Sequence, residues 1–149
     1  MKTVLVAAAL LAASAAAHAD GQKLFTATNP TWQAECGSCH LAYPPQLLPA
    51  RSWRALMTGL DKHFGTDASV DTKTAAVISA FLEKNAGSER GATAKPVLRI
   101  SETGWFRHEH DEMSASVWRN PKVKSASNCA ACHTGATRGD FNEHSIRIP

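Results

Sequence analysis

The residues most able to do chemistry in this sequence lie in two copies of one five-residue motif. Cys-x-x-Cys-His occupies positions 36–40 and again 129–133, and the two copies contain all four cysteines of the 149-residue chain. Two thiols at this spacing can form thioether bonds to the two vinyl groups of one porphyrin, and the imidazole that follows can ligate the iron. The sequence therefore predicts two covalently attached c-type haems. The attaching residues would be Cys36, Cys39, Cys129 and Cys132, and the first iron ligands His40 and His133.

Two other uses of cysteine compete with this interpretation. An even number of cysteines in an exported protein is compatible with disulfides, and two Cys-His groups can share one zinc ion. Disulfides do not require a histidine directly after each cysteine pair. A shared zinc site would have to join motifs that are separated by a whole helical segment. Both alternatives explain the sequence less completely than two haems do.

The second axial ligand decides what each haem can do, because an iron with two strong protein ligands has no position left for a substrate. Apolar residues recur at helical spacing between 50 and 63, and His63 extends the stripe that contains Leu56 and Leu60. Met57 is the alternative ligand, but a methionine in the middle of an apolar helix face is usually core filler. His63 is therefore the predicted second ligand of the first haem.

For the second haem the sequence offers several candidates. The segment 105–113 is a short helical candidate, and a helix there would place His110 on one face with Phe106. His110 is the predicted ligand on this ground. The alternatives that remain open are His108, His144, Met113 and an open second haem.

The elements expected around these residues are mainly helical. Helices are predicted from Pro30 into the first motif, with Asn29 as N-cap, across 50–63, and from Asp71 to before Gly87. A proline-rich loop at 41–49 and a small polar linker at 88–95 separate them. The second half shows little periodicity, so we expect its haem to hold it together. Four tryptophans are expected to pack around the haems as core: Trp32, Trp53, Trp105 and Trp118.

The first 19 residues are typical of a cleavable export signal. Lys2 precedes an apolar run at 4–13, and Ala-His-Ala at 17–19 matches a small-x-small cleavage site. An uncleaved membrane anchor is the alternative, although the run is short for a bilayer span. We expect a periplasmic protein whose mature chain is soluble, with no transmembrane span. The formal net charge of +3 falls to +2 when Lys2 is removed with the signal, and four haem propionates would shift it towards neutral or slightly negative. No nucleic-acid partner is therefore indicated.

Several longer strings resemble the small periplasmic dihaem cytochromes c of proteobacteria. They are ECGSCHLAYPP at 35–45, LPARSW at 48–53, HFG at 63–65, NCAACH at 128–133 and the chain ending at 139–149. The resemblance covers almost the whole mature chain. These strings are much more specific than the Cys-x-x-Cys-His motif alone.

The resemblance implies a mainly α fold with a class I cytochrome c-like haem domain at 20–90 and a haem-organised domain with little regular structure at 91–149. It implies bis-histidine ligation of both haems, with His63 and His110 as distal ligands, and electron transfer without catalysis. It also implies a small high-spin haem protein and a b-type membrane cytochrome as redox partners. The competing function is a small peroxidase-like enzyme or gas sensor that uses an open second haem.

Overall fold

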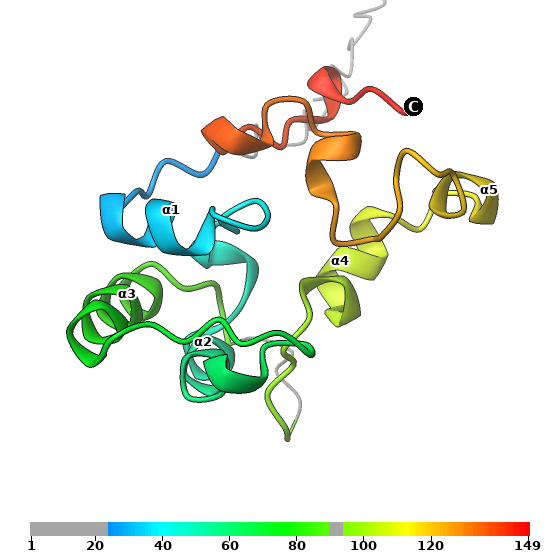
Figure 1. The fold of residues 1–149 in the computed structure, drawn as a ribbon. Helices are drawn as coiled ribbons and strands as arrows, with labels where there is room; N and C mark the ends of the chain where they lie inside the picture. The colour runs from blue at the N-terminus through cyan, green and yellow to red at the C-terminus, as the bar shows by residue number, and fades with distance from the viewer. Residues whose placement is uncertain (1–23, 90–93) are drawn as a thin grey trace, which may run out of the picture.

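The computed structural model describes residues 24–89 and 94–149, so the predicted signal peptide at 1–19 and part of the linker at 88–95 lie outside the described residues. Within the described ranges the chain consists of short helices joined by turns, and β pairing is limited to isolated bridges (Figure 1). The mainly α fold class is confirmed. In this part of the chain no helix has the length and apolarity that a bilayer span needs.

The helix that leads into the first motif is α1, Pro30–Cys36. Asn29 caps it, because the Asn29 side-chain oxygen accepts a 3.0 Å hydrogen bond from the Trp32 backbone N–H. Pro30 occupies the first turn, where a missing N–H costs nothing. The prediction for this helix is confirmed.

The second helix is shorter than the sequence pattern predicts. α2 spans Ala50–Met57 and not 50–63, because the chain turns at Thr58 and Gly59. The Thr58 hydroxyl donates to the Ala55 carbonyl at 3.0 Å, and glycine is a poor helix former. A 3₁₀ turn, η2 at Leu60–Lys62, then leads directly to His63.

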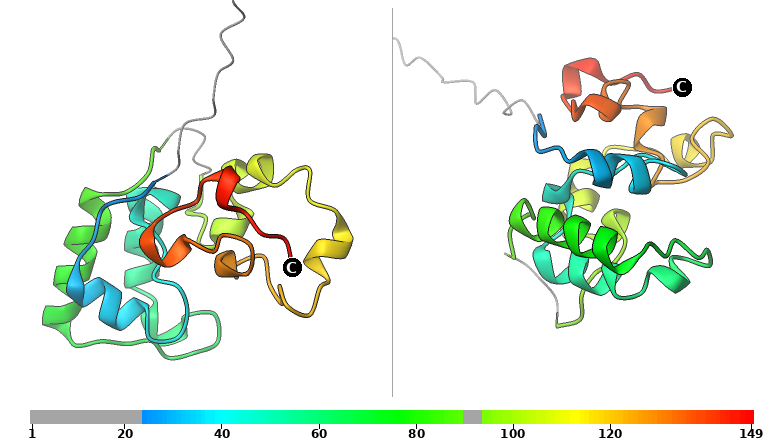
Figure 2. Two further views of the ribbon diagram at one scale, coloured as in Figure 1. Left: turned by 90° about the horizontal axis from the view of Figure 1, so that it is seen from above. Right: turned by 60° about the vertical axis from the view of Figure 1, so that its left-hand side comes forward.

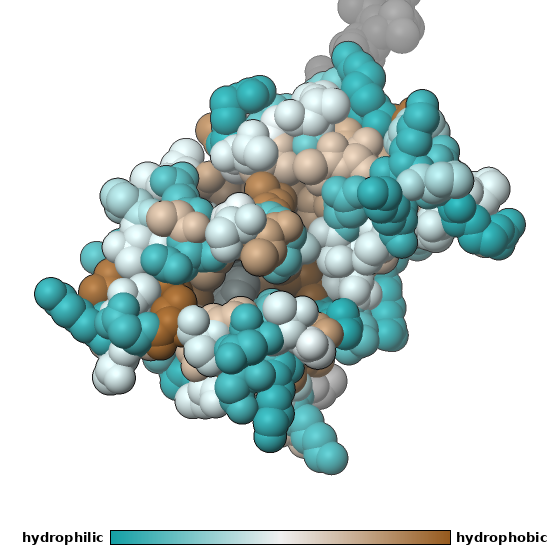
Figure 3. Space-filling model, viewed as in Figure 1, coloured by the Kyte–Doolittle hydropathy of each residue, from teal (hydrophilic) through white to brown (hydrophobic). Residues whose placement is uncertain are grey.

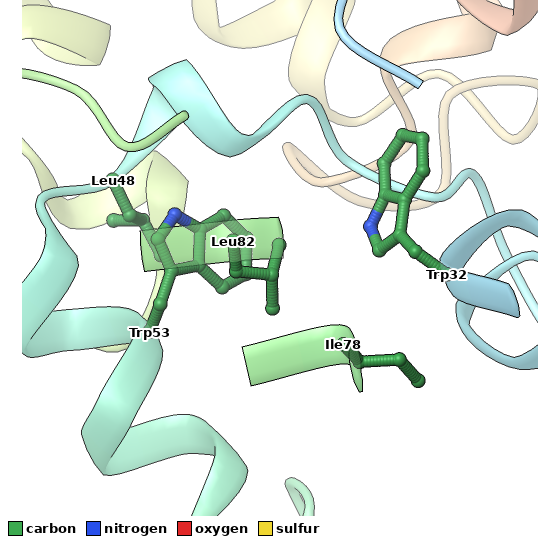
Figure 4. Packing of buried hydrophobic residues seen from close by; sticks show 5 residues of the cluster. All are labelled: Trp32, Leu48, Trp53, Ile78 and Leu82. Atoms are coloured by element: carbon green, nitrogen blue, oxygen red, sulfur yellow. The ribbon is translucent and has the colours of Figure 1, made fainter. Parts of the chain in front are cut away.

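The third helix, α3 at Thr72–Lys84, has Asp71 as N-cap and confirms the predicted element. α1, α2 and α3 enclose the buried cluster of Trp32, Leu48, Trp53, Ile78 and Leu82 (Figure 4). Within it the Trp53 indole N–H donates to the Pro45 carbonyl at 2.7 Å, which fixes the proline-rich loop and its 3₁₀ turn η1, Pro45–Leu47, against the helices. This cluster is a conventional hydrophobic core for the first half.

The second half contains only short elements. They are η3 Ile100–Glu102, α4 Gly104–Glu109, α5 Ala115–Trp118, η4 Cys129–Ala131, η5 Ala136–Arg138 and η6 Glu143–Ser145. The predicted helix at 105–113 therefore ends early, and His110 is its C-cap residue. The buried apolar residues here, Phe106, Val123, Ala136 and Phe141, do not join the cluster of the first half.

The two halves contact each other where the segment before α1 meets the C-terminal segment. The segment that precedes α1 lies beside the C-terminal segment (Figures 1 and 2), with a 2.9 Å hydrogen bond from the Phe25 N–H to the Gly139 carbonyl. The Phe25 and Phe141 rings contact edge to face, with centroids 5.4 Å apart. A second link is the Tyr43 hydroxyl, which donates to the Ser127 carbonyl at 2.7 Å.

Candidate haem-binding sites

The first motif begins inside a helix. Cys36 is the last residue of α1, and Gly37 caps it with an N–H donated to the Gln33 carbonyl at 3.0 Å. A Cβ at position 37 would collide with that same carbonyl, so the first variable residue of this motif has to be glycine. Cys39 and His40 follow on the exposed side of the turn. The helix end thus aims both thiols and the imidazole from one turn of backbone.

The four thiols are free, and none forms a disulfide. Burial, together with the nearby Glu35 carboxylate, raises the pKa of the Cys36 thiol to about 11. Burial likewise raises the pKa of the Cys129 thiol to about 11. Among the residues described, no group of three or more His, Cys, Asp or Glu side chains could hold a metal ion. The geometry therefore supports neither the disulfide nor the zinc alternative.

His40 and His63 face one another across the first half. Their ring centroids are 6.2 Å apart and their planes differ by 24°. Two iron–nitrogen bonds of about 2 Å, plus about 1.1 Å from each nitrogen to its ring centre, give a separation of roughly 6 Å. The pair thus has the spacing that two imidazoles on one iron require.

The two imidazoles of this pair are held differently. His40 Nδ1 donates to the Leu41 carbonyl at 2.8 Å, and its ring stacks on Tyr43 with centroids 4.9 Å apart. His63 Nδ1 is buried and has no hydrogen-bond partner in the described part of the chain. Burial, then the neighbouring His40 and Arg99, lowers the pKa of His63. The lowered pKa favours the neutral form of His63, the form that ligates metals. The hydrogen bond at Nδ1 of His40 leaves its Nε2 for the iron.

The chain bends sharply directly after His63. Phe64 and Gly65 both have positive φ, +51° and +96°, and the Thr66 N–H returns to the His63 carbonyl at 3.0 Å. The Arg99 guanidinium lies 4.0 Å from the centre of the Phe64 ring, a cation–π contact that connects the second half to this bend. This turn, and not a continued helix, positions His63.

The second motif is built without an α-helix. η4 contains Cys129, and the His133 N–H donates to the Cys129 carbonyl at 2.8 Å. The C-terminal segment braces this turn, because the Arg147 N–H donates to the Cys132 carbonyl at 2.9 Å and His133 forms a β-bridge with Ile146.

His110 is the imidazole that faces His133. The ring centroids are again 6.2 Å apart, but the planes differ by 75°. His110 Nδ1 donates to the Phe106 carbonyl at 2.8 Å, and its ring stacks on the Phe106 ring with centroids 4.0 Å apart. This is the i, i+4 neighbour that the sequence indicated, although α4 ends one residue before His110.

The other candidate ligands lie elsewhere. The His108 side chain is 82% exposed and has its Nδ1 3.9 Å from Asp111, while His144 is exposed in η6. Met57 packs against the hydrophobic cluster of the first half. Met113 lies beyond the end of α4, so the helix that would have placed it on one face with His110 does not reach it. Of the four tryptophans, Trp32 and Trp53 are buried, whereas Trp105 is 40% exposed.

The groups that orient the imidazoles cannot be recognised from the sequence alone. The carbonyls of Leu41 and Phe106 leave no signal in a sequence, because every residue has one. Tyr43 and Arg99 are chemically distinctive, but only the fold shows that they lie beside His40 and Phe64.

The surroundings of these residues suit a large apolar cofactor. Figure 3 shows the face of the molecule hollowed near its centre, with apolar residues beside the hollow. Two facing imidazole pairs, free thiols beside each pair and the covered Nδ1 of His63 all fit covalently bound haem. Such a group would supply the apolar surface around which the second half can pack.

Comparison with known proteins gives consistent matches. The family model described as dihaem cytochrome c matches residues 32–141. A solved structure of a dihaem cytochrome c from Rhodobacter sphaeroides is 48% identical, with a TM-score of 0.72, over 78% of this chain and 99% of that one. The dihaem cytochrome from Shewanella baltica OS155 is 41% identical, with a TM-score of 0.72, over 81% of this chain and 93% of that one. Among curated proteins the search gives no match.

These matches cover both motifs, and in sequence as well as in structure they extend over most of the chain. The chain therefore belongs to the dihaem cytochrome c family, whose cofactors are two c-type haems with iron and whose activity is haem-based electron transfer.

Proposed function

We propose that this protein is a periplasmic electron carrier in which both haems are low-spin and ligated by two histidines each. One observation carries the proposal. Each Cys-x-x-Cys-His motif has a second imidazole opposite its own, and both pairs have the 6.2 Å centroid separation that suits one iron.

In this assignment each half binds one haem. Cys36 and Cys39 attach the first, with His40 and His63 as ligands; Cys129 and Cys132 attach the second, with His133 and His110 as ligands. The bound haems supply one-electron Fe(III)/Fe(II) chemistry. The carbonyls of Leu41 and Phe106 keep the proton of His40 and His110 on Nδ1, so that Nε2 presents its lone pair to the metal. An iron bound by two of these imidazoles would have no position left for a substrate.

The cellular setting follows from the same chemistry. The segment 1–19 would direct the chain to the periplasm, where covalent haem attachment in bacteria takes place. We propose other redox proteins as partners, among them a small high-spin haem protein and a b-type membrane cytochrome, and no nucleic acid.

Carbon monoxide binding to the reduced holoprotein tests the ligation. The wild type is expected to show low-spin absorption spectra and no rapid spectral change with carbon monoxide. His63→Ala and His110→Ala should each open one iron and create carbon monoxide binding at half of the haem. His108→Ala is the matched control, since its exposed ring should leave the spectra unchanged. Rapid carbon monoxide binding or high-spin bands in the wild type would instead indicate an enzyme or a gas sensor.

A further inference from the structure

The two imidazole pairs differ in the angle between their rings. At equal centroid separations of 6.2 Å, the planes of His40 and His63 are 24° apart, whereas those of His110 and His133 are 75° apart. The first pair is thus close to parallel and the second close to perpendicular.

At the second site the crossed arrangement is held by neighbouring residues. The His110 ring is fixed twice by Phe106, through the 2.8 Å hydrogen bond to its carbonyl and through a stack in which the two rings are 18° from parallel. Trp118 contacts the same ring, with centroids 5.9 Å apart. On the opposite side His133 lies against Phe141, with centroids 5.2 Å apart. Phe106 and Phe141 are each 8% exposed, so neither has room to move and let the imidazoles rotate.

The first site has a different set of restraints. The His40 ring is held by the Leu41 carbonyl and by Tyr43, whose ring plane is 28° from its own. The His63 ring meets the edge of Phe64 at 60°, with centroids 4.8 Å apart. The sharp backbone bend at Phe64 and Gly65 fixes where that edge lies. The near-parallel pair is therefore also imposed by the protein.

Ring orientation has an electronic consequence for ferric iron. Each imidazole donates from a π orbital perpendicular to its ring into one of the two iron dπ orbitals. Two parallel rings act on the same dπ orbital and therefore separate the two dπ orbitals in energy, which stabilises the ferric state. Crossed rings act on one orbital each and leave the two nearly equal in energy. The protein can in this way tune two haems that have identical ligands.

We propose that the protein makes its two bis-histidine haems electronically different by holding the first pair of imidazoles parallel and the second pair crossed, with Phe106 as the positioning residue at the second site. This proposal rests on the proposed bis-histidine ligation. In the ferric protein the first haem gives a rhombic low-spin spectrum. The second gives a low-spin signal dominated by one large g value. The crossed rings also favour reduction of the second haem relative to the same site with parallel rings.

Electron paramagnetic resonance of the frozen, fully oxidised holoprotein tests this directly. The expected spectrum contains both low-spin types in equal amounts. Two rhombic signals, or two signals with one large g value, would overturn the proposal while leaving bis-histidine ligation intact. A high-spin signal in the wild type would overturn the proposed function as well, so the two failures are distinguishable.

Variants assign each signal to a site. His110→Ala is expected to abolish the large-g signal and His63→Ala the rhombic one; the opposite pattern would overturn the proposal. Phe106→Leu keeps the carbonyl but removes the stack, and should shift or broaden the large-g signal. Phe64→Leu is the matched control at the first site and should leave the large-g signal in place. An unchanged large-g signal in a folded, low-spin Phe106→Leu protein would show that Phe106 does not position His110.

Discussion

The histidines assigned to iron differ in what holds their second nitrogen. His40 and His110 donate from Nδ1 to backbone carbonyls, each at 2.8 Å. His63 has a buried Nδ1 without such an acceptor in the described part of the chain. An acceptor on Nδ1 fixes the tautomer and makes the imidazole a stronger donor. His63 is therefore positioned by its backbone bend and by packing, and not by a hydrogen bond to its ring.

A hydrogen bond of the same kind anchors the core residue Trp53. Its indole N–H donates to the Pro45 carbonyl at 2.7 Å in a buried environment. Trp53→Phe removes the donor and leaves that carbonyl with only the 3.4 Å hydrogen bond from the Leu48 N–H. The loss should lower the free energy of unfolding by about 0.5–1.5 kcal/mol beyond the loss of packing, the net value of one hydrogen bond. Chemical unfolding of the holoprotein, followed by circular dichroism, would measure the change.

Trp32→Phe is the control for this prediction. Trp32 belongs to the same cluster and is 6% exposed against 8% for Trp53. Within residues 24–89 and 94–149 its indole nitrogen makes no hydrogen bond, so only packing is lost. Equal losses of stability in the two variants would show that the Trp53–Pro45 hydrogen bond contributes nothing.

At this scale the sequence predicts the attachment residues well and their surroundings poorly. Each motif carries two thiols and an imidazole within five consecutive residues, so no tertiary contact is needed to propose Cys36, Cys39 and His40. The helical stripe predicts His63, although the helix ends at Met57 and a 3₁₀ turn leads to the residue. Orientation of the rings depends on contacts between distant segments, which periodicity does not encode.

At the scale of elements, the N-cap of α3 links helix stability to pH. Hydrogen bonds from the Thr74 side chain and from backbone N–H groups of the first turn lower the pKa of Asp71 below its ordinary 3.8. Because the folded-state pKa is the lower one, the stabilisation is present above 3.8 and is lost as pH falls through the lowered pKa. The wild type should therefore lose stability in acid more steeply than Asp71→Asn, which caps the helix without a charge.

Chemical unfolding midpoints of the two proteins, measured from about pH 6 down to about pH 2, would test this cap. Asp71→Asn should be the less stable protein at neutral pH, and the difference should shrink as Asp71 is protonated. A difference that stays constant across this range would contradict the prediction.

Gly139 lies where the C-terminal segment contacts the segment before α1. It has φ of +75°, and a Cβ there would collide with the Phe25 carbonyl. Gly139→Ala should therefore cost more than the roughly 1–2 kcal/mol of a left-handed alanine alone, and should loosen the contact between Phe25 and Phe141. Thermal unfolding would report the loss of stability.

Gly65→Ala separates the collision from the backbone cost. Gly65 also has positive φ, +96°, but nothing lies within 4 Å of the position of its Cβ. Gly65→Ala should therefore lower the stability only by the cost of holding an alanine in a left-handed backbone conformation. If Gly139→Ala proves no more costly than Gly65→Ala, the contact with Phe25 is not a constraint.

Element prediction succeeded where local signals were complete. α1 and α3 begin at Asn29 and Asp71 caps that can be read from the sequence, because the capping partner lies two or three residues away. The end of α2 and the 3₁₀ turns of the second half were not predicted. Each of these 3₁₀ turns is only three residues long, which is too short to leave a periodic pattern in the sequence.

For the whole molecule, the two halves depend on their cofactors to different degrees. The hydrophobic cluster of Trp32, Leu48, Trp53, Ile78 and Leu82 lies entirely in the first half. The second half consists of short helices and turns, and its buried residues do not join that cluster. Replacing Cys129 and Cys132 by alanine should therefore leave α1, α2 and α3 protected from amide hydrogen exchange while 104–149 exchanges much faster.

The corresponding double alanine variant of Cys36 and Cys39 serves as comparison. It should weaken the first half but leave slow exchange in α3, because Ile78 and Leu82 are each only 1% exposed and belong to the hydrophobic cluster of the first half. Retained protection across 104–149 in the first variant would show that the second half folds without its haem.

Coupling between the halves depends in part on Tyr43. Its hydroxyl donates to the Ser127 carbonyl at 2.7 Å, two residues before Cys129, and its ring stacks on His40. Burial, then the nearby Cys129 thiol, raises the pKa of Tyr43, so the hydroxyl remains a donor at neutral pH. Tyr43→Phe should lower the free energy of unfolding by about 0.5–1.5 kcal/mol, the net value of one hydrogen bond, and should increase amide hydrogen exchange around the second motif.

Thr58→Val is the control for this prediction. It removes a 3.0 Å hydrogen bond within the C-terminal turn of α2 and should increase amide hydrogen exchange only in the first half. If both variants perturb the same half, the Tyr43 hydroxyl does not link the two haem sites.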